Sequence, residues 1–159
     1  MATDKELKQA KRAHSKFCEM LDEQNWKYSR DDEKLTVTTG ATGDDLPIDI
    51  RVNVDTDKQL VTILSQLPFS VPEENRVLMA VVVNVANFTL VDGSFDYNLS
   101  NGNIIFRMTT SIRDSLVGKD VFEYMLFVTC NTVDTYNDKL LMVMKNQMSL
   151  EQFMKFAKE

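Results

Sequence analysis

The sequence has very little of the two residue types that most often carry metal sites and catalysis. Its 159 residues include one histidine, His14, and two cysteines, Cys18 and Cys130. A zinc site needs four protein ligands, or three and a water, and these dispersed residues do not provide them. A Ser-His-acid or Cys-His arrangement would have to use His14, which lies on an apolar helical face and is typical of a core histidine. The sequence predicts no metal site and no catalytic residue.

Glycine is also scarce, and none of the five glycines belongs to a nucleotide-binding pattern. The glycines of a loop expected at 40–45 are not followed by Lys-Ser/Thr or by a helix start, so this loop does not form a phosphate cradle. The cysteines follow no motif spacing and lie among apolar helical positions, which favours reduced thiols over a disulfide. We therefore predict no cofactor, and a protein that is not an enzyme.

An excess of positive charge and a long apolar run are absent as well. The formal net charge is −6, and the deficit lies in residues 35–139, which hold seven Lys/Arg against fourteen Asp/Glu. An acidic body of this kind disfavours nucleic acid and anionic membranes as partners. No apolar run approaches the roughly 20 residues that cross a bilayer, and the charged N-terminus lacks the apolar centre of a secretory signal. A cytoplasmic protein with no membrane partner is expected.

The hydrophobic patterning predicts the α+β class. Residues 1–159 are expected to form one domain, because a chain of this length can bury a core without a disulfide or a metal site. Thr3 and Glu6 have capping-box spacing at the start of a helix that continues through Leu21. Alternating apolar and polar residues then predict a hairpin over 26–39 and strands over 48–54 and 59–67. The proline at position 68 is expected to end the last of these strands.

The face of the first helix opposite its apolar face is basic. Lys5, Lys8, Arg12 and Lys16 lie about 180° from the apolar stripe at roughly 100° per residue. Such a stripe is typical of an ordinary solvated helix face. A binding face for an acidic partner is the alternative.

Residues 68–98 contain the most apolar predicted helix, starting near Pro72 with acidic residues in its first turn. Apolar residues cover most of its circumference, and its polar stripe is narrow: Glu73, Arg76, Asn84 and Asn87. A β-branched run over 81–85 would suit a strand, but the length and the N-terminal signals favour a helix. A helix this apolar must be covered on more than one side, by another helix or by a second subunit. We predict a homodimer or partner contact that includes Val81, Val85 and Phe88.

The remaining chain predicts a hairpin over 95–112 around an Asn-Gly turn, and a long helix from about Lys119. A last helix starts at Ser149, with a capping box to Gln152. The helical C-terminus, about 140–159, is methionine-rich, which suits either adaptable partner contacts or irregular core filling. Met144 and Met148 are added to the predicted contacts. The fold class is α+β: a mostly antiparallel sheet of five to six strands with helices packed on it.

The segment from the 48–54 strand to the strand beginning at Ile104 resembles the YbjN family of bacterial proteins. The stretches that carry the resemblance are LPIDIRVNVD, QLVTILSQLPFSVPEENR, the Val83, Asn84, Ala86 and Asn87 pattern, DGSFDYN and GNIIFRMTTS. The resemblance covers roughly residues 20–140. It implies a sensory-transduction regulator with a fold similar to type III secretion chaperones, ordered helix, three strands, helix, two strands, helix. Those chaperones are homodimers that bind extended client segments, and no catalytic residues come with the likeness.

Together these observations favour a non-catalytic, chaperone-like or regulatory protein-binding module that acts as a homodimer with an unidentified protein partner. The alternative is a small-ligand sensor with a pocket between sheet and helices. Its polar groups would be Asn84, Asn87, Arg107 and Tyr97.

Overall fold

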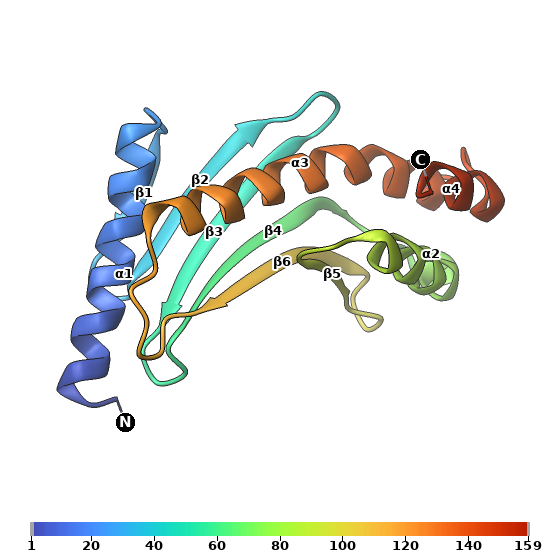
Figure 1. Ribbon diagram of the computed structural model, residues 1–159. Coiled ribbons are helices and arrows are strands. Elements are labelled where there is room, and N and C mark those ends of the chain that lie inside the picture. The colour runs from blue at the N-terminus through green and yellow to red at the C-terminus, as the bar shows by residue number, and fades with distance from the viewer. Residues whose placement is uncertain (1, 159) are drawn as a thin grey trace.

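Six antiparallel strands form one sheet in the computed structural model, which describes residues 2–158. The sheet order is β1-β2-β3-β4-β6-β5 (Figure 1). The strands are β1 (Tyr28–Asp31), β2 (Thr36–Thr42), β3 (Pro47–Asp55), β4 (Leu60–Ser70), β5 (Ser94–Tyr97) and β6 (Asn103–Ser111). The helices are α1 (Asp4–Glu23), the 3₁₀ turn η1 (Glu73–Asn75), α2 (Arg76–Thr89), α3 (Lys119–Met144) and α4 (Leu150–Phe156). The predicted α+β class is confirmed, with six strands.

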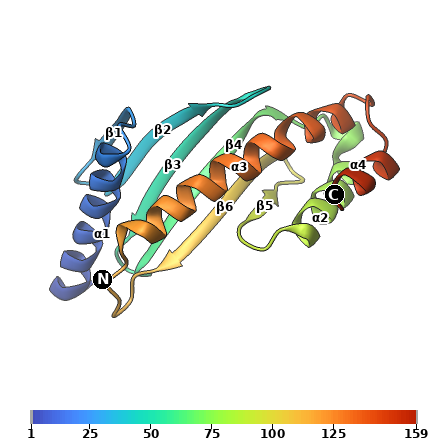
Figure 2. The ribbon, with the colours of Figure 1, turned by 45° about the horizontal axis from the view of Figure 1, so that its top comes forward.

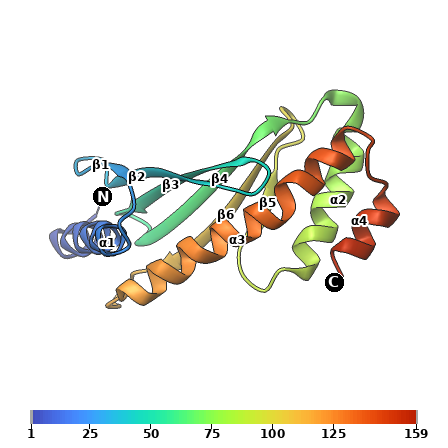
Figure 3. The ribbon, with the colours of Figure 1, turned by 90° about the horizontal axis from the view of Figure 1, so that it is seen from above.

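Helices cover only one face of this sheet. In β3, Ile48, Ile50, Val52 and Val54 are buried, whereas the alternating Asp49 and Arg51 are exposed. Helices α1 and α3 lie on the buried face and meet where α3 begins, and α2 and α4 lie beyond one end of the sheet (Figures 2 and 3). The alternation along the strands therefore separates a core face from an open face.

Helix α1 begins where its capping signal predicts. The Thr3 side chain accepts from the Glu6 amide, and the Glu6 carboxylate accepts from the Thr3 amide. His14 is buried, with Nε2 3.1 Å from the Thr36 carbonyl oxygen of β2. It is a core histidine that ties α1 to the sheet, in agreement with the sequence analysis.

Two predicted boundaries in the sheet are wrong. Strand β4 does not end at Pro68 but continues to Ser70, because the β4–β6 register shifts between Gln66 and Ser70. A proline is tolerated at such an irregularity, where no ladder bond needs its missing N–H. Residues 40–42 are the end of β2, so the β2–β3 loop is shorter than the predicted 40–45.

The C-terminal helices start at the predicted residues. Helix α3 begins at Lys119, and α4 follows Ser149, whose capping box with Gln152 is formed. The Phe153 and Phe156 rings of α4 pack on Tyr136 of α3, with centroids 6.2 and 5.3 Å from it. This aromatic cluster holds the chain end against the rest of the helical layer.

The methionine-rich C-terminus contributes mainly to packing. Met144 and Met148 are half-buried and pack against the core, and Met142 is half-buried as well. Met154 is the most exposed methionine of this segment. Of the two sequence-based alternatives for this stripe, irregular core filling accounts for three of its four members.

Candidate protein-binding surfaces

Helix α2 lies antiparallel to the C-terminal half of α3. At its start, Asn75 Nδ2 donates to the Met144 carbonyl oxygen at 2.8 Å. At its end, the Thr89 and Tyr136 hydroxyls are 2.9 Å apart. Its buried residues are Met79, Val82, Val83 and Ala86. The predicted second cover of this helix is therefore supplied in part by the chain's own α3 and α4.

The opposite face of α2 is apolar and uncovered within the protomer. The exposed fractions are 77% for Val77, 46% for Val81 and 90% for Phe88, and Val91, just after the helix, is 99% exposed. Asn84 is exposed between them. A surface helix normally turns polar residues to water, so an apolar outer face of this kind marks an interaction site.

Exposed apolar residues of α3 extend this face. Val121, Tyr124 and Phe127 are exposed on α3, and Phe127 is 73% accessible. The Tyr124 hydroxyl donates to Asp92 Oδ2, which follows Val91 in the chain, and so brings the α3 group next to the end of α2. We call the combined set the α2–α3 apolar surface: Val77, Val81, Phe88, Val91, Val121, Tyr124 and Phe127.

The predicted contact residues divide between this surface and the core. Val81 and Phe88 belong to the surface, whereas Val85, Met144 and Met148 are half-buried against the core. The sequence analysis missed the α3 members. A usable signal was present in the sequence. Val121, Tyr124 and Phe127 lie outside the series of residues at helical spacing that faces the sheet.

The four polar groups of the predicted ligand pocket do not come together. Asn84 is exposed on α2, and Arg107 pairs with Asp96 on the open sheet face, with Nε to Oδ2 at 2.8 Å. The Tyr97 hydroxyl is buried without a hydrogen-bond partner among residues 2–158. Neither of the two cavities described below is lined by any of the four. The ligand sensor stays a prediction.

The Asn87 side chain links the end of α2 to β5. Its Nδ2 donates to the Phe95 carbonyl oxygen at 2.9 Å, and its Oδ1 accepts from the Phe95 amide at 2.7 Å. One side chain thereby satisfies both backbone groups of a β5 residue and fixes the end of α2 to the sheet. A ligand would have to compete with both bonds.

Replacing this asparagine should cost stability. We expect Asn87→Ala to lower the free energy of unfolding by about 2 kcal/mol, because it leaves a part-buried N–H and C=O of Phe95 unpaired. The matched control is Asn84→Ala on the exposed face of the same helix, which should not lower the stability of the protomer, because this side chain forms no hydrogen bond within residues 2–158. Urea unfolding of both variants measures the difference in stability. Equal stabilities would contradict the role assigned to the two Asn87–Phe95 hydrogen bonds.

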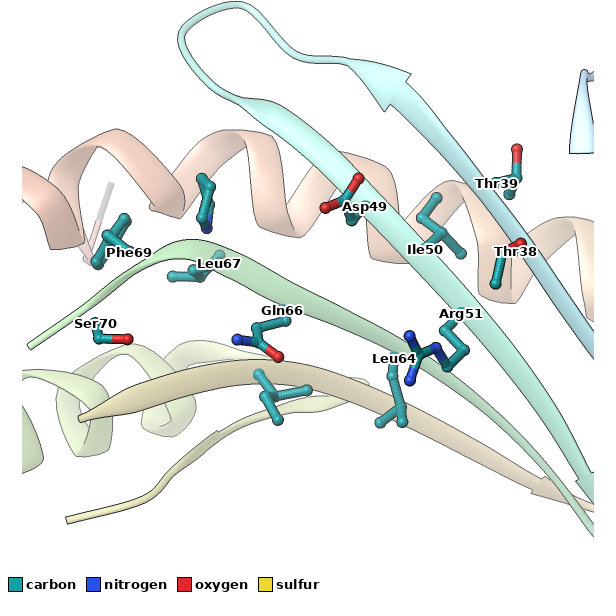
Figure 4. Close-up of a pocket in the computed structure, with 12 residues that line it drawn as sticks. Thr38, Thr39, Asp49, Ile50, Arg51, Leu64, Gln66, Leu67, Phe69 and Ser70 are labelled. Atoms are coloured by element: carbon teal, nitrogen blue, oxygen red, sulfur yellow. The ribbon is translucent and has the colours of Figure 1, made fainter. Parts of the chain in front are cut away.

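A cavity of about 720 Å³ opens on the free face of the sheet where β3 and β4 separate. Figure 4 shows it with α3 behind, Asp49, Ile50 and Arg51 on the β3 side, and Leu64 and Gln66 on the β4 side. It is the larger of the two cavities. We call it the β3–β4 fork.

A second cavity, of about 450 Å³, lies along the basic stripe of α1. Its walls include Lys8, Arg12 and Lys16 on one side and Leu116 and Val117 on the other. The three cations form no ion pair within residues 2–158, whereas Lys5 pairs with Asp114 at 2.8 Å. This groove fits the sequence-based alternative of an acidic partner.

The free thiols are poorly suited to chemistry. Cys18 is buried, and desolvation of the partly buried Cys130 thiol, with the nearby Asp134, raises the pKa of Cys130 to about 11. Within residues 2–158 no three His, Cys, Asp or Glu side chains are grouped as metal ligands. The same part of the chain has no helix that is both long and apolar enough to cross a bilayer.

The Cys130 thiol should therefore react slowly. The thiolate is the reactive form, and a pKa raised from 9.0 to about 11 reduces its fraction near pH 8 roughly 100-fold. We expect labelling by a disulfide reagent at pH 8 to be slower than that of a free thiol, by roughly tenfold, because a thiolate of higher pKa is also the stronger nucleophile. The Cys130→Ser variant identifies the site, and rapid labelling of Cys130 in the folded protein would contradict its burial.

These features define an α+β protein with helices on one face of an antiparallel sheet and with exposed apolar and basic surfaces. A family model described as "Putative bacterial sensory transduction regulator" matches residues 15–142, and the chain belongs to this YbjN family. No curated protein matches the chain. The family predicted from the sequence is confirmed.

Solved structures agree in fold. The crystal structure of YbjN from E. coli superposes with a TM-score of 0.59 at 8% identity, covering 84% of this chain and 92% of that one. The ExsC–ExsE complex gives 0.58 at 11% identity, covering 81% and 93%. The HopA1–SchA chaperone–effector complex gives 0.44 at 10% identity, covering 84% and 90%. The similarity in fold to type III secretion chaperones is confirmed.

Proposed function

We propose that the chain is a non-catalytic protein-binding module that acts as a homodimer in the bacterial cytoplasm, in a chaperone-like or regulatory role. The α2–α3 apolar surface is the observation that carries this proposal. The family description as a regulator and the fold shared with ExsC, whose structure is of a complex with ExsE, also support it.

A second copy of the chain is the occupant that we assign to this surface. Most dimers of identical chains have two-fold symmetry, which places the same patch of both subunits in contact. A helix whose outer face from Val77 to Phe88 is apolar except for Asn84 can pack against its own symmetry copy along its length. The surface also shows the aromatic enrichment of protein interfaces, since it presents Phe88, Tyr124 and Phe127. Client binding would then use the faces that the dimer leaves free.

Sedimentation velocity between about 1 and 50 μM tests the proposal, since a specific dimer of micromolar or tighter affinity is populated in this range. We expect a protein of twice the 18.2 kDa chain mass. A protein that stays monomeric at the upper concentration would contradict the homodimer.

A further inference from the structure

The cavity of about 450 Å³ runs along the basic side of α1. Its other wall is the segment that joins β6 to α3, which lies beside α1 (Figure 1). We call it the α1 groove. Lys8, Arg12 and Lys16 line it from α1, each one helical turn from the next, and together they span about 12 Å. Leu116 and Val117 line the other side, so the groove has a cationic wall and an apolar wall.

The apolar wall is fixed to α1 by hydrogen bonds. The Gln9 side-chain amide donates to two backbone carbonyl oxygens of this wall, those of Ile112 and Ser115, the second at 2.8 Å. With the wall held in this position, the Leu116 side chain is 77% exposed beside the cations. The groove is therefore formed without a partner, and a partner that enters it does not have to order the wall.

The three cations of the α1 groove have no carboxylate of their own. They form no ion pair within residues 2–158, although Lys16 is half-buried. Farther along the same face of α1 the charges are neutralised, since Glu19 and Glu23 both pair with Lys119, at 3.3 and 2.6 Å. Like charges four residues apart on a helix repel, so the cationic series does not stabilise α1. This distinguishes the series from an ordinary solvated face and favours a binding role.

The two walls select a partner segment that is acidic on one side and apolar beside it. In an α-helix, residues i, i+4 and i+8 follow each other about every 6 Å. A helix that lies along the groove can therefore place one carboxylate opposite each cation. The residue after each carboxylate is turned by about 100° and faces the apolar wall. The α1 wall offers an extended segment no backbone pairing, because its amides and carbonyls bond within the helix.

Nucleic acids and anionic membranes fit these walls less well. Within the described part of the chain, no aromatic side chain lines the groove for a base to stack on. A membrane surface would also meet the surrounding acidic body, since the net charge of the chain is −6. A single helix meets only the groove, because exposed charges farther away than about 8 Å are largely screened at physiological salt.

We propose that the α1 groove binds an acidic amphipathic helix of a protein partner. Carboxylates at positions i, i+4 and i+8 of that helix pair with Lys8, Arg12 and Lys16, and the apolar residues that follow them contact Leu116 and Val117. This inference rests on the proposed protein-binding function. It names the chemistry of a partner and a site that shares no residue with the α2–α3 apolar surface.

Two adjacent residues of α1 provide a matched test. Arg12 lines the groove, whereas Lys11 is exposed on the same helix and does not line it. Arg12→Glu and Lys11→Glu therefore change the net charge equally, but only the first changes the groove. The probe is the fluorescein-labelled peptide acetyl-Leu-Ala-Glu-Leu-Ala-Gln-Glu-Leu-Ala-Gln-Glu-Leu-Ala-Gln-amide, followed by anisotropy at about 0.15 M salt. Its Glu residues are four positions apart, and a Leu follows each of them.

Arg12→Glu should weaken peptide binding at least roughly tenfold, because it replaces an attractive charge pair with a repulsive one. Lys11→Glu should change binding less than about twofold, because its charge lies outside the groove and is screened. The triple variant Lys8→Glu, Arg12→Glu, Lys16→Glu should lose the Glu peptide and bind the same peptide with Lys in place of each Glu. This gain of binding also shows that the triple variant is folded.

The apolar wall and the helical form of the partner are tested separately. Leu116→Ser should weaken binding at least roughly fivefold, because it removes an apolar contact with the peptide. A peptide with proline at its two central positions cannot form a helix and should bind at least roughly tenfold more weakly. Equal binding of the proline peptide would overturn a helical partner.

The outcomes separate this inference from the proposed function. No binding of the Glu peptide to the unmodified protein overturns the inference, and so does an equal loss in Arg12→Glu and Lys11→Glu. Binding to phosphatidylglycerol vesicles without binding to the peptide would make the occupant a lipid surface and would also overturn it. None of these results affects the dimer, which sedimentation measures. A monomeric protein that binds the peptide through Arg12 would overturn the homodimer and leave the α1 groove site standing.

Discussion

Phe88→Asp is expected to convert the dimer into a folded monomer. The Phe88 side chain is 90% exposed in the protomer, so the substitution removes almost no intramolecular contact. In the dimer it would remove a buried aromatic ring, worth about 1.5–3 kcal/mol, and place an unpaired carboxylate in an apolar interface. We expect a loss of about 3 kcal/mol or more, which weakens dimerisation at least roughly 100-fold. Sedimentation velocity measures the association, and thermal unfolding followed by circular dichroism measures the fold.

Leu116→Asp is the matched control, because it introduces the same charge at an apolar residue that is also mostly exposed but lies in the α1 groove. It should remain dimeric. Val81→Asp is a weaker test, since about half of that side chain is covered within the protomer and a charge there also destabilises the monomer. If Phe88→Asp still sediments as a dimer, the α2–α3 apolar surface is not the interface.

The sequence predicted most helix starts because these depend on local chemistry. Thr3 and Ser149 cap their helices through side-chain bonds to amides three residues on, and both signals can be read without knowledge of the fold. The Asn-Gly turn at 101–102 is similarly local, and the structure forms the predicted β5–β6 hairpin around it. The start of α2 is less sharp, since a 3₁₀ turn over Glu73–Asn75 precedes the α-helix at Arg76.

The orientation of α2 was not available from a helical wheel. Apolar residues occupy almost every side of this helix, so its sequence does not say which side faces the sheet. The structure buries Met79 and Val83 and exposes Phe88, which was one of the predicted contact residues. The choice is made by distant residues, among them Tyr136 of α3 and Phe95 of β5, which bond to the end of the helix.

The β3–β4 fork could not be predicted because strand periodicity reports burial and not pairing partners. Buried and exposed residues of β3 alternate regularly on both sides of Arg51, the last β3 residue that pairs with β4. Pro68 was the one local sign of an irregular β4, and it was taken as the end of the strand. The structural features near the fork are contacts between distant residues: the β4–β6 register shift, and the bond that the Asp44 amide of the β2–β3 loop donates to Asp134 of α3.

Gly102→Ala is expected to cause the largest loss of stability of any single methyl addition to this chain's glycines. Gly102 has φ +77°, a conformation that costs a residue with a Cβ about 1–2 kcal/mol. A Cβ at this position would also lie 2.1 Å from the Val71 carbonyl oxygen and 2.8 Å from the Val71 nitrogen. These are backbone atoms that no rotamer change can move. The contact must therefore open.

Separating Gly102 from Val71 would break the hydrogen bonds that hold the segment between β4 and η1. The Val71 amide donates to the Gly102 carbonyl oxygen at 2.9 Å, and Arg76 Nε donates to the Val71 carbonyl oxygen at 3.3 Å. Val71 is buried between β4 and η1, so this segment sets where α2 begins. Leaving such groups unpaired costs about 1–3 kcal/mol in addition to the backbone strain. We expect a total loss of about 3 kcal/mol or more in urea unfolding.

A second substitution at Gly102 separates the cost of backbone strain from the cost of the contact with Val71. Asn accepts positive φ better than Ala, so Gly102→Asn should recover stability if backbone strain dominates, and should remain as unstable as Gly102→Ala if the contact with Val71 dominates. The 2.1 Å approach favours the second result. Gly118→Ala is the control, because Gly118 has φ −81° and no heavy atom within 4 Å of an added Cβ, so its loss should stay below about 1 kcal/mol. Wild-type stability of both Gly102 variants would mean that the β5–β6 turn does not pack on Val71 in solution, and the start of α2 would then need another anchor.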